Sequence, residues 1–128
     1  MIGGLAVNTY VAPVYTLDAD IVVIGAALPR LAEYLQERVV SDLRIQFTTD
    51  ERYQSFLERS VEGEVLGVRV RVASLEDVTQ GKLWAYSDPH RRLSKRKKDE
   101  LDLIRLAEAY PQLKFLYPDH LNELIDLG

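Results

Sequence analysis

The sequence predicts an α/β or α+β fold with a small mixed sheet of about three or four strands and helices packed on it. Two observations predict this class. Strand-like segments alternate with helical segments in the first part of the chain, and helices gather at its C-terminal end. The 128 residues are 47% hydrophobic and 28% charged, which is typical of one compact soluble domain. We therefore predict a single domain over residues 1–128.

The first predicted elements are a helix, a strand and a second helix. Residues 3–10 open with two glycines and are predicted to form a helix, which the proline at position 13 ends. A strand is expected at 15–24, because its second half is β-branched and apolar. The next helix is predicted by apolar residues that recur at helical spacing between Leu28 and Val39.

The middle of the chain predicts two strands with a short helix between them. Residues 43–48 alternate between apolar and polar side chains, as expected of a half-buried strand. A short helix is expected at 50–59, with Tyr53 and Phe56 in it. Residues 64–73 alternate again and predict another strand.

The C-terminal part predicts three helices. Ser74, with Asp77 three residues later, resembles an acidic capping box and starts a helix over 75–86. A strong helix is expected over about 96–110, where a proline ends it. A short helix near 118–126 closes the chain.

Composition and charge exclude several classes of protein. Residues 91–98 carry six basic side chains and no acid, so the other 120 residues carry ten basic against twenty acidic groups. This is an acidic domain with one basic segment rather than a generally basic nucleic-acid binder. The absence of cysteine excludes disulfides and thiolate metal sites. No apolar run is long enough to span a membrane and no signal peptide is apparent, so a cytoplasmic location is expected.

Two features near the N-terminus could bind a metal and a phosphate. Asp18 and Asp20 alternate along a predicted strand, so their carboxylates share a face and repel unless a cation such as Mg²⁺ lies between them. The alternative is that both acids lie at a solvated strand end. Gly3-Gly4, which thirteen residues separate from Asp18, could let backbone N–H groups approach a phosphate.

The C-terminal helices carry the other candidates. Lys82 falls within an apolar stripe, where a lysine either extends to solvent or meets an anion. Lys98, Asp99 and Asp102 share one face of the next helix with Lys95. That face is either solvated, with pairs such as Lys98 and Asp102, or it forms a phosphate-binding strip with Arg92. It holds no aromatic residue, which disfavours a stacking surface for single strands.

Together these features resemble the nucleotidyltransferase superfamily, in particular the AbiEii/AbiGii type of bacterial toxin–antitoxin systems. The superfamily is marked by a GG or GS pair followed, about a dozen residues later, by D-x-D on a strand. Gly3-Gly4 and Asp18-Ala19-Asp20, with Thr16 before them, match this pattern.

Two later segments extend the resemblance over nearly the whole chain. The stretch SLEDVTQGKLWA resembles the family segment that contains an essential lysine, which would be Lys82. The stretch RRLSKRKKDELDLIRLAEAYP resembles the last motif, an arginine followed by Lys-Asp, and this matches Arg92, Lys98 and Asp99.

The resemblance implies a fold, an activity and partners. Active members transfer a nucleoside monophosphate from an NTP to a hydroxyl group, and the acceptor would be RNA, tRNA or protein. Asp18 and Asp20 would hold Mg²⁺. Gly3-Gly4, Lys82, Arg92 and Lys98 would hold the nucleotide, while Asp99 would orient Lys98 or the acceptor. An antitoxin protein is the implied partner.

The chain departs from the family pattern in two ways. The family's third metal-binding acid is missing from the predicted strand at 43–48, where Arg44 and Gln46 occupy the polar side. This leaves a degenerate domain, which binds a nucleotide, nucleic acid or protein without catalysis, as the alternative. The family's first helix and strand are also missing, so either the start is truncated or the sheet has an open edge. An open edge predicts a homodimer, and the alternative is a monomer in which the C-terminal helices cover the gap.

Overall fold

A computed structural model of the chain describes residues 1–10, 18–22, 44–48, 50–65 and 68–128. The helix predicted between Leu28 and Val39 lies outside these residues. The chain divides into two compact units, Met1–Ser74 and Leu75–Gly128, and each is described by itself. The single domain predicted from the sequence stays a prediction.

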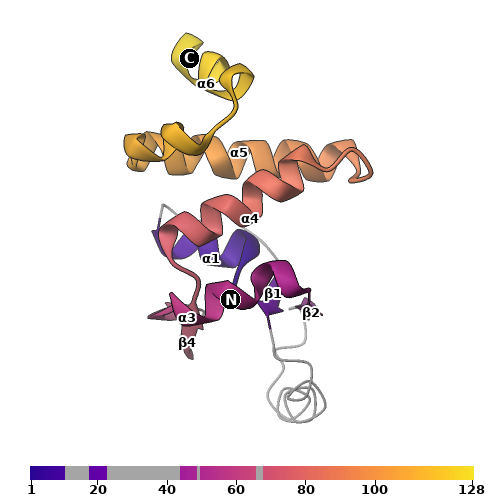
Figure 1. The fold of residues 1–128 in the computed structure, drawn as a ribbon, viewed down its shortest axis with the longest axis vertical. Coiled ribbons are helices and arrows are strands. Elements are labelled where there is room, and N and C mark those ends of the chain that lie inside the picture. The colour runs from indigo at the N-terminus through magenta and orange to yellow at the C-terminus, as the bar shows by residue number, and fades with distance from the viewer. Residues whose placement is uncertain (11–17, 23–43, 49, 66–67) are drawn as a thin grey trace. The chain divides into compact units, whose positions relative to one another are not determined.

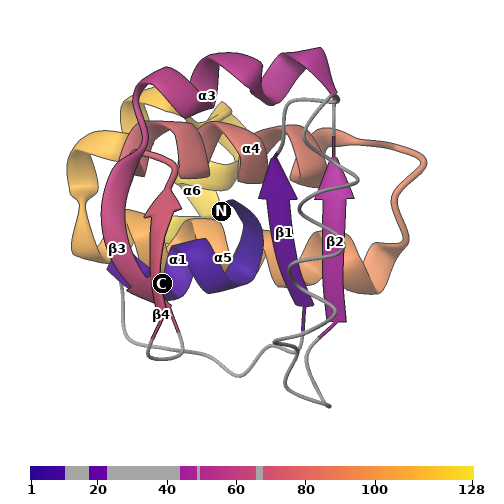
Figure 2. The ribbon, with the colours of Figure 1, turned by 90° about the horizontal axis from the view of Figure 1, so that it is seen from below.

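The first unit begins with a helix and a parallel pair of strands. Helix α1 spans Gly3–Tyr10, β1 spans Asp18–Val22 and β2 spans Arg44–Thr48. The two strands lie side by side and run in the same direction (Figure 2). Both strands were predicted, and the described residues of β1 lie within the predicted segment 15–24.

A hairpin follows where the sequence predicted one strand over 64–73. Strands β3 (Val61–Val65) and β4 (Val68–Val72) pair in antiparallel fashion. Valines occupy odd positions in β3 (Val61 and Val65) and even positions in β4 (Val68, Val70 and Val72), so the alternation shifts by one residue at the two-residue connection. The predicted strand began at residue 64 and ran across this shift, so it joined the end of β3 to β4.

The described strands form two two-stranded sheets, one parallel and one antiparallel. The fold is therefore broadly α+β, as predicted, with most of the regular structure in helices. A single sheet of three or four strands is not seen within the described part of the chain.

The core of the first unit lies around α1 and a short helix. Helix α1 packs against β1 and β3, and the Tyr10 hydroxyl donates a hydrogen bond to the carbonyl of Ala73 at 2.8 Å. The helix predicted at 50–59 is present as a 3₁₀ turn, η2 (Glu51–Tyr53), followed by α3 (Gln54–Glu58). The buried apolar residues of this unit are Ala6, Val7, Phe56, Val72 and Ala73.

The second unit is entirely helical. It contains α4 (Leu75–Ser87), α5 (Leu93–Ala109), the 3₁₀ helix η3 (Pro111–Leu116) and α6 (Asp119–Leu127) (Figure 1). The three predicted α-helices are confirmed. Helix α5 begins three residues earlier than expected, and η3 was not predicted.

Apolar packing joins the helices of this unit. Helices α4 and α5 pack along each other, and η3 contacts both. The Tyr117 hydroxyl donates to the carbonyl of Leu103 at 2.7 Å and so attaches the C-terminal segment to α5. The buried apolar residues are Val78, Leu83, Leu103, Leu106, Ala107, Leu113, Tyr117 and Leu121.

Candidate functional site

A buried cluster of charged side chains lies between α4 and α5. The Lys82 ammonium Nζ lies 3.1 Å from Oδ1 of Asp99 and 2.8 Å from Oδ2 of Asp102. The side chains of Lys82 and Asp99 are only 9% and 2% exposed. Of the two alternatives for Lys82, the structure selects the one in which it meets an anion.

Two arginines that the sequence analysis did not single out complete this cluster. Arg91 donates two hydrogen bonds to the Asp99 carboxylate, from Nε to Oδ2 at 2.7 Å and from Nη2 to Oδ1 at 3.3 Å. This is a bidentate contact. Arg105 donates from Nη1 to Oδ1 of Asp102 at 2.8 Å. Helical spacing alone could have found Arg105, which lies three residues after its partner.

The five residues Lys82, Arg91, Asp99, Asp102 and Arg105 are called the ion cluster below. Three cations face two carboxylates, so the ion cluster carries one excess positive charge. Oδ2 of Asp102 is buried and accepts no hydrogen bond, although Lys82 lies beside it. The close approach is an ion pair whose direction does not suit a hydrogen bond.

This geometry corrects the sequence interpretation of α5. Asp99 and Asp102 are buried rather than solvated, and the partners of Asp102 are Lys82 and Arg105 rather than Lys98. The reason is tertiary: the acids face α4, and a buried carboxylate needs a nearby cation.

The two remaining basic candidates lie outside the ion cluster. Arg92 is exposed and occupies the N-cap position of α5, where its side chain makes no capping hydrogen bond. Lys98 is half-buried on α5. The arginine that contacts Asp99 is thus Arg91, one residue before the one that the motif indicated.

The N-terminal candidates lie together in the first unit. Helix α1 begins at Gly3, whose φ of 77° is in the left-handed region that favours glycine. This helix packs against β1, which carries Asp18 and Asp20. The parallel register sets Asp18 opposite Arg44 and Asp20 opposite Gln46.

These residues fit a hard divalent cation in part. Two carboxylates at alternate positions of one strand are a suitable donor pair for Mg²⁺. The neighbouring strand adds an arginine and an amide at the matching register positions, and neither replaces a carboxylate. Among the residues whose side chains the structure describes, no three acids or histidines gather into a group able to hold a metal.

A shallow pocket of about 300 Å³ opens elsewhere in the second unit. Residues from α4, α5 and α6 line it: Tyr86, Ser87, Leu93, Arg96, Lys97, Glu100 and His120. No role was predicted from the sequence for Tyr86 or His120, whereas Arg96 and Lys97 belong to the basic segment 91–98, for which an RNA or DNA contact was one hypothesis.

Comparison with known proteins assigns no family. No family model matches the chain, and no curated protein is significantly similar to it. The resemblance to nucleotidyltransferases therefore stays a prediction from the motifs. Within the described ranges, no helix is long and apolar enough to cross a membrane.

Proposed function

We propose that this chain is a nucleotidyltransferase-like protein that transfers a nucleoside monophosphate from an NTP to a hydroxyl acceptor. One observation carries the proposal: a helix that begins with Gly3 in a left-handed conformation packs against the strand that carries Asp18 and Asp20. Phosphate binding needs backbone N–H groups that a ligand can approach, and phosphoryl transfer needs charge neutralisation.

In this proposal the first unit binds the triphosphate. Asp18 and Asp20 hold Mg²⁺, which when bound neutralises phosphate charge and polarises the reacting oxygens. The backbone of Gly3 and Gly4 contacts the phosphates, because the absence of a Cβ lets a ligand approach closely.

The ion cluster supports a positioning role in the second unit. Lys82 is held by two carboxylates, so it reaches a phosphate only if those ion pairs open. Arg91 is the most accessible cation of the ion cluster, with 36% of its side chain exposed. Asp99 fixes both Lys82 and Arg91, which agrees with an orienting role for this acid. Arg92 and Lys98 add positive charge along the same helix.

The acceptor and partners follow from the same proposal. RNA, tRNA and protein hydroxyl groups are the proposed acceptors, and an antitoxin protein is the proposed binding partner. A cytoplasmic setting is proposed with them.

The decisive experiment is label transfer. The chain is incubated with α-³²P-labelled NTPs, Mg²⁺ and cellular RNA or protein, and transfer is expected to fall at least a hundredfold in Asp20→Ala. Asp119→Ala is the matched control, because Asp119 is an exposed acid on α6. Equal transfer by the wild type and Asp20→Ala would contradict the assignment of this acid.

A second function is favoured by the strand register. Arg44 and Gln46 lie opposite Asp18 and Asp20, which supports a domain that binds a nucleotide without transferring it. This alternative predicts NTP binding by calorimetry without label transfer. Gln46→Asp, which adds an acid beside Asp20, is then expected to increase Mg²⁺ affinity. A wild type that binds no NTP would exclude both functions.

A further inference from the structure

We propose that the pocket between α4, α5 and α6 binds one unpaired base of single-stranded RNA, with the adjoining phosphates on Arg96 and Lys97. RNA binding itself does not depend on the proposed function. The role of the pocket in holding an RNA acceptor does rest on that function.

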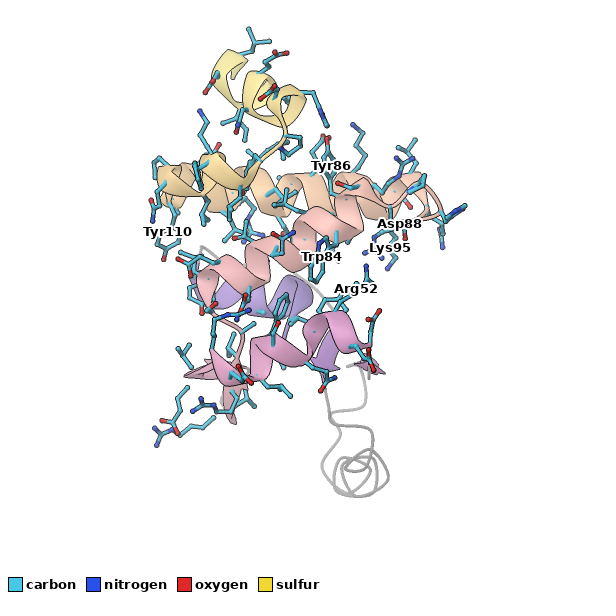
Figure 3. All side chains as sticks on the ribbon, in the orientation of Figure 1. Arg52, Trp84, Tyr86, Asp88, Lys95 and Tyr110 are labelled. Carbon is cyan, nitrogen blue, oxygen red and sulfur yellow. The ribbon has the colours of Figure 1, made fainter. Side chains whose placement is uncertain are left out.

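The wall of the pocket is an aromatic pair. The rings of Tyr86 and His120 stack with their centroids 5.9 Å apart and an interplanar angle of 26°, and their polar ends, Tyr86 Oη and His120 Nε2, lie 3.2 Å apart. Tyr86 belongs to the last turn of α4 (Figure 3), and His120 is exposed on α6. Every nucleobase has a π-face that stacks on such rings.

The pair is held in place by its surroundings. Partial burial, followed by the nearby Glu100 carboxylate, raises the pKa of the Tyr86 hydroxyl above its usual range. A tyrosine hydroxyl is protonated at physiological pH even without this shift, so Tyr86 keeps its interaction with His120. A pre-ordered aromatic surface loses little side-chain freedom when a base binds.

Cations lie on the α5 side of the pocket. The Nε of Arg96 donates to the carbonyl of Arg91 at 3.1 Å, which fixes the side chain while using only one of its donors. Lys97 is 64% exposed and makes a loose pair with Glu100 at 3.3 Å. Both cations belong to the basic segment 91–98, and a phosphate chain would follow this segment.

The dimensions favour one base over a larger ligand. A volume of about 300 Å³ lies at the small end of ligand pockets. Ser87 and Glu100 supply hydrogen-bonding groups at its edge, and Leu93 supplies an apolar surface. The sequence analysis disfavoured stacking because the basic segment holds no aromatic residue. The structure brings the aromatic residues from two other helices.

The test is fluorescence anisotropy with the full chain and a labelled single-stranded RNA about ten nucleotides long. The buffer contains EDTA and no NTP, so failure here is separate from failure of the transfer assay. His120→Ala is expected to weaken binding about tenfold, whereas His90→Ala, an exposed histidine outside the pocket, should leave it unchanged. Tyr86→Phe keeps the ring and should bind within about twofold of the wild type.

The salt dependence and two competitors complete the test. Arg96→Gln should lower the slope of log K against log salt by about one. Tighter binding of a duplex of the same sequence, or of AMP than of the strand, would overturn the proposal. Equal affinity of His120→Ala and His90→Ala, or no RNA binding by the wild type at low salt, would overturn it as well.

Discussion

At the scale of single residues, Lys82 shows how one buried charge fixes its neighbours. It contacts one carboxylate on each of two successive turns of α5, Asp99 and Asp102. Those acids in turn hold Arg91 and Arg105. A buried ion pair contributes little net stability, but the loss of Lys82 removes one of the two cationic partners of each buried carboxylate.

We predict that Lys82→Met lowers the free energy of unfolding by about 3 kcal/mol. The value lies at the low end of the range for buried pairs, because Arg91 and Arg105 still contact the two acids. Urea unfolding followed by circular dichroism measures the change. Lys97→Met is the control, since Lys97 is mainly exposed and its replacement should have an effect of less than about 0.5 kcal/mol. Equal stability of the two variants would contradict a structural role for the ion cluster.

Tyr117 gives a prediction for alkaline pH. Burial raises the pKa of its hydroxyl well above the usual value. The unfolded chain therefore releases this proton first, near pH 10, so the stabilisation is complete below pH 10 and declines as the pH rises. We expect Tyr117 to contribute a loss of about 1.4 kcal/mol per pH unit above pH 10.

Tyr117→Phe isolates this contribution. The variant should be about 1 kcal/mol less stable at neutral pH, because it lacks the hydrogen bond to Leu103. Its stability should then fall less steeply than that of the wild type between about pH 10 and 11. If the free energy of unfolding falls with pH equally in the two proteins, the Tyr117 hydroxyl has the same pKa in the folded and the unfolded chain. That result would contradict the prediction.

At the scale of elements, helix α5 begins with a residue poorly suited to a helix N-terminus. Arg92 is the N-cap, its side chain caps no backbone N–H, and the first turn contains no acid. The basic residues of segment 91–98 also oppose the helix dipole. These features explain why the sequence predicted the start at about 96 rather than at Leu93.

We predict that Arg92→Asp raises the free energy of unfolding by about 1 kcal/mol. Aspartate accepts hydrogen bonds from the first backbone N–H groups and places a negative charge at the positive end of the dipole. Thermal unfolding is measured for Arg92→Asp and for Arg92→Ala. The difference between the two variants gives the effect of capping and negative charge, apart from the effect of removing the arginine. If Arg92→Asp also reduces NTP binding, Arg92 contributes to ligand binding although it makes α5 less stable. An unchanged or lower stability in Arg92→Asp would contradict the capping argument.

The elements show which features a sequence pattern can reveal. Helices α4, α5 and α6 have periodic apolar residues and clear prolines or caps, so they were predicted close to their observed bounds. The hairpin at 61–72 was predicted as one strand over 64–73, although the alternation of apolar residues shifts by one residue between Val65 and Val68. The 3₁₀ helix η3 was missed, because its six residues are too few for a periodic signal.

The candidate site likewise contains residues that were predicted from the sequence and residues that were not. Lys82, Asp99 and Asp102 were selected from the motifs, and the structure joins them. Arg91 was missed because a loop position gives no periodic signal, and the motif favoured its neighbour. The pairing of Tyr86 with His120 spans 34 residues. No local pattern predicts such a contact, since it depends on how three helices pack.

At the scale of the whole molecule, the two-stranded sheets bear on whether the chain associates with a second copy of itself. Within the described residues, β1 and β2 pair only with each other. Parallel strands are usually buried in larger sheets, and an isolated two-stranded sheet is only marginally stable. An unpaired edge offers backbone N–H and C=O groups to another strand.

We predict that the chain forms a homodimer through such an edge. Light scattering at micromolar concentration should give twice the monomer mass of 14.6 kDa, because two-fold pairing satisfies both edges at once. Phe115, which is 92% exposed, offers a competing route through apolar contact. Phe115→Ser should therefore remain dimeric if the sheet edge makes the interface. A monomeric wild type would contradict the dimer, and a dimer lost in Phe115→Ser would move the interface to the C-terminal helices.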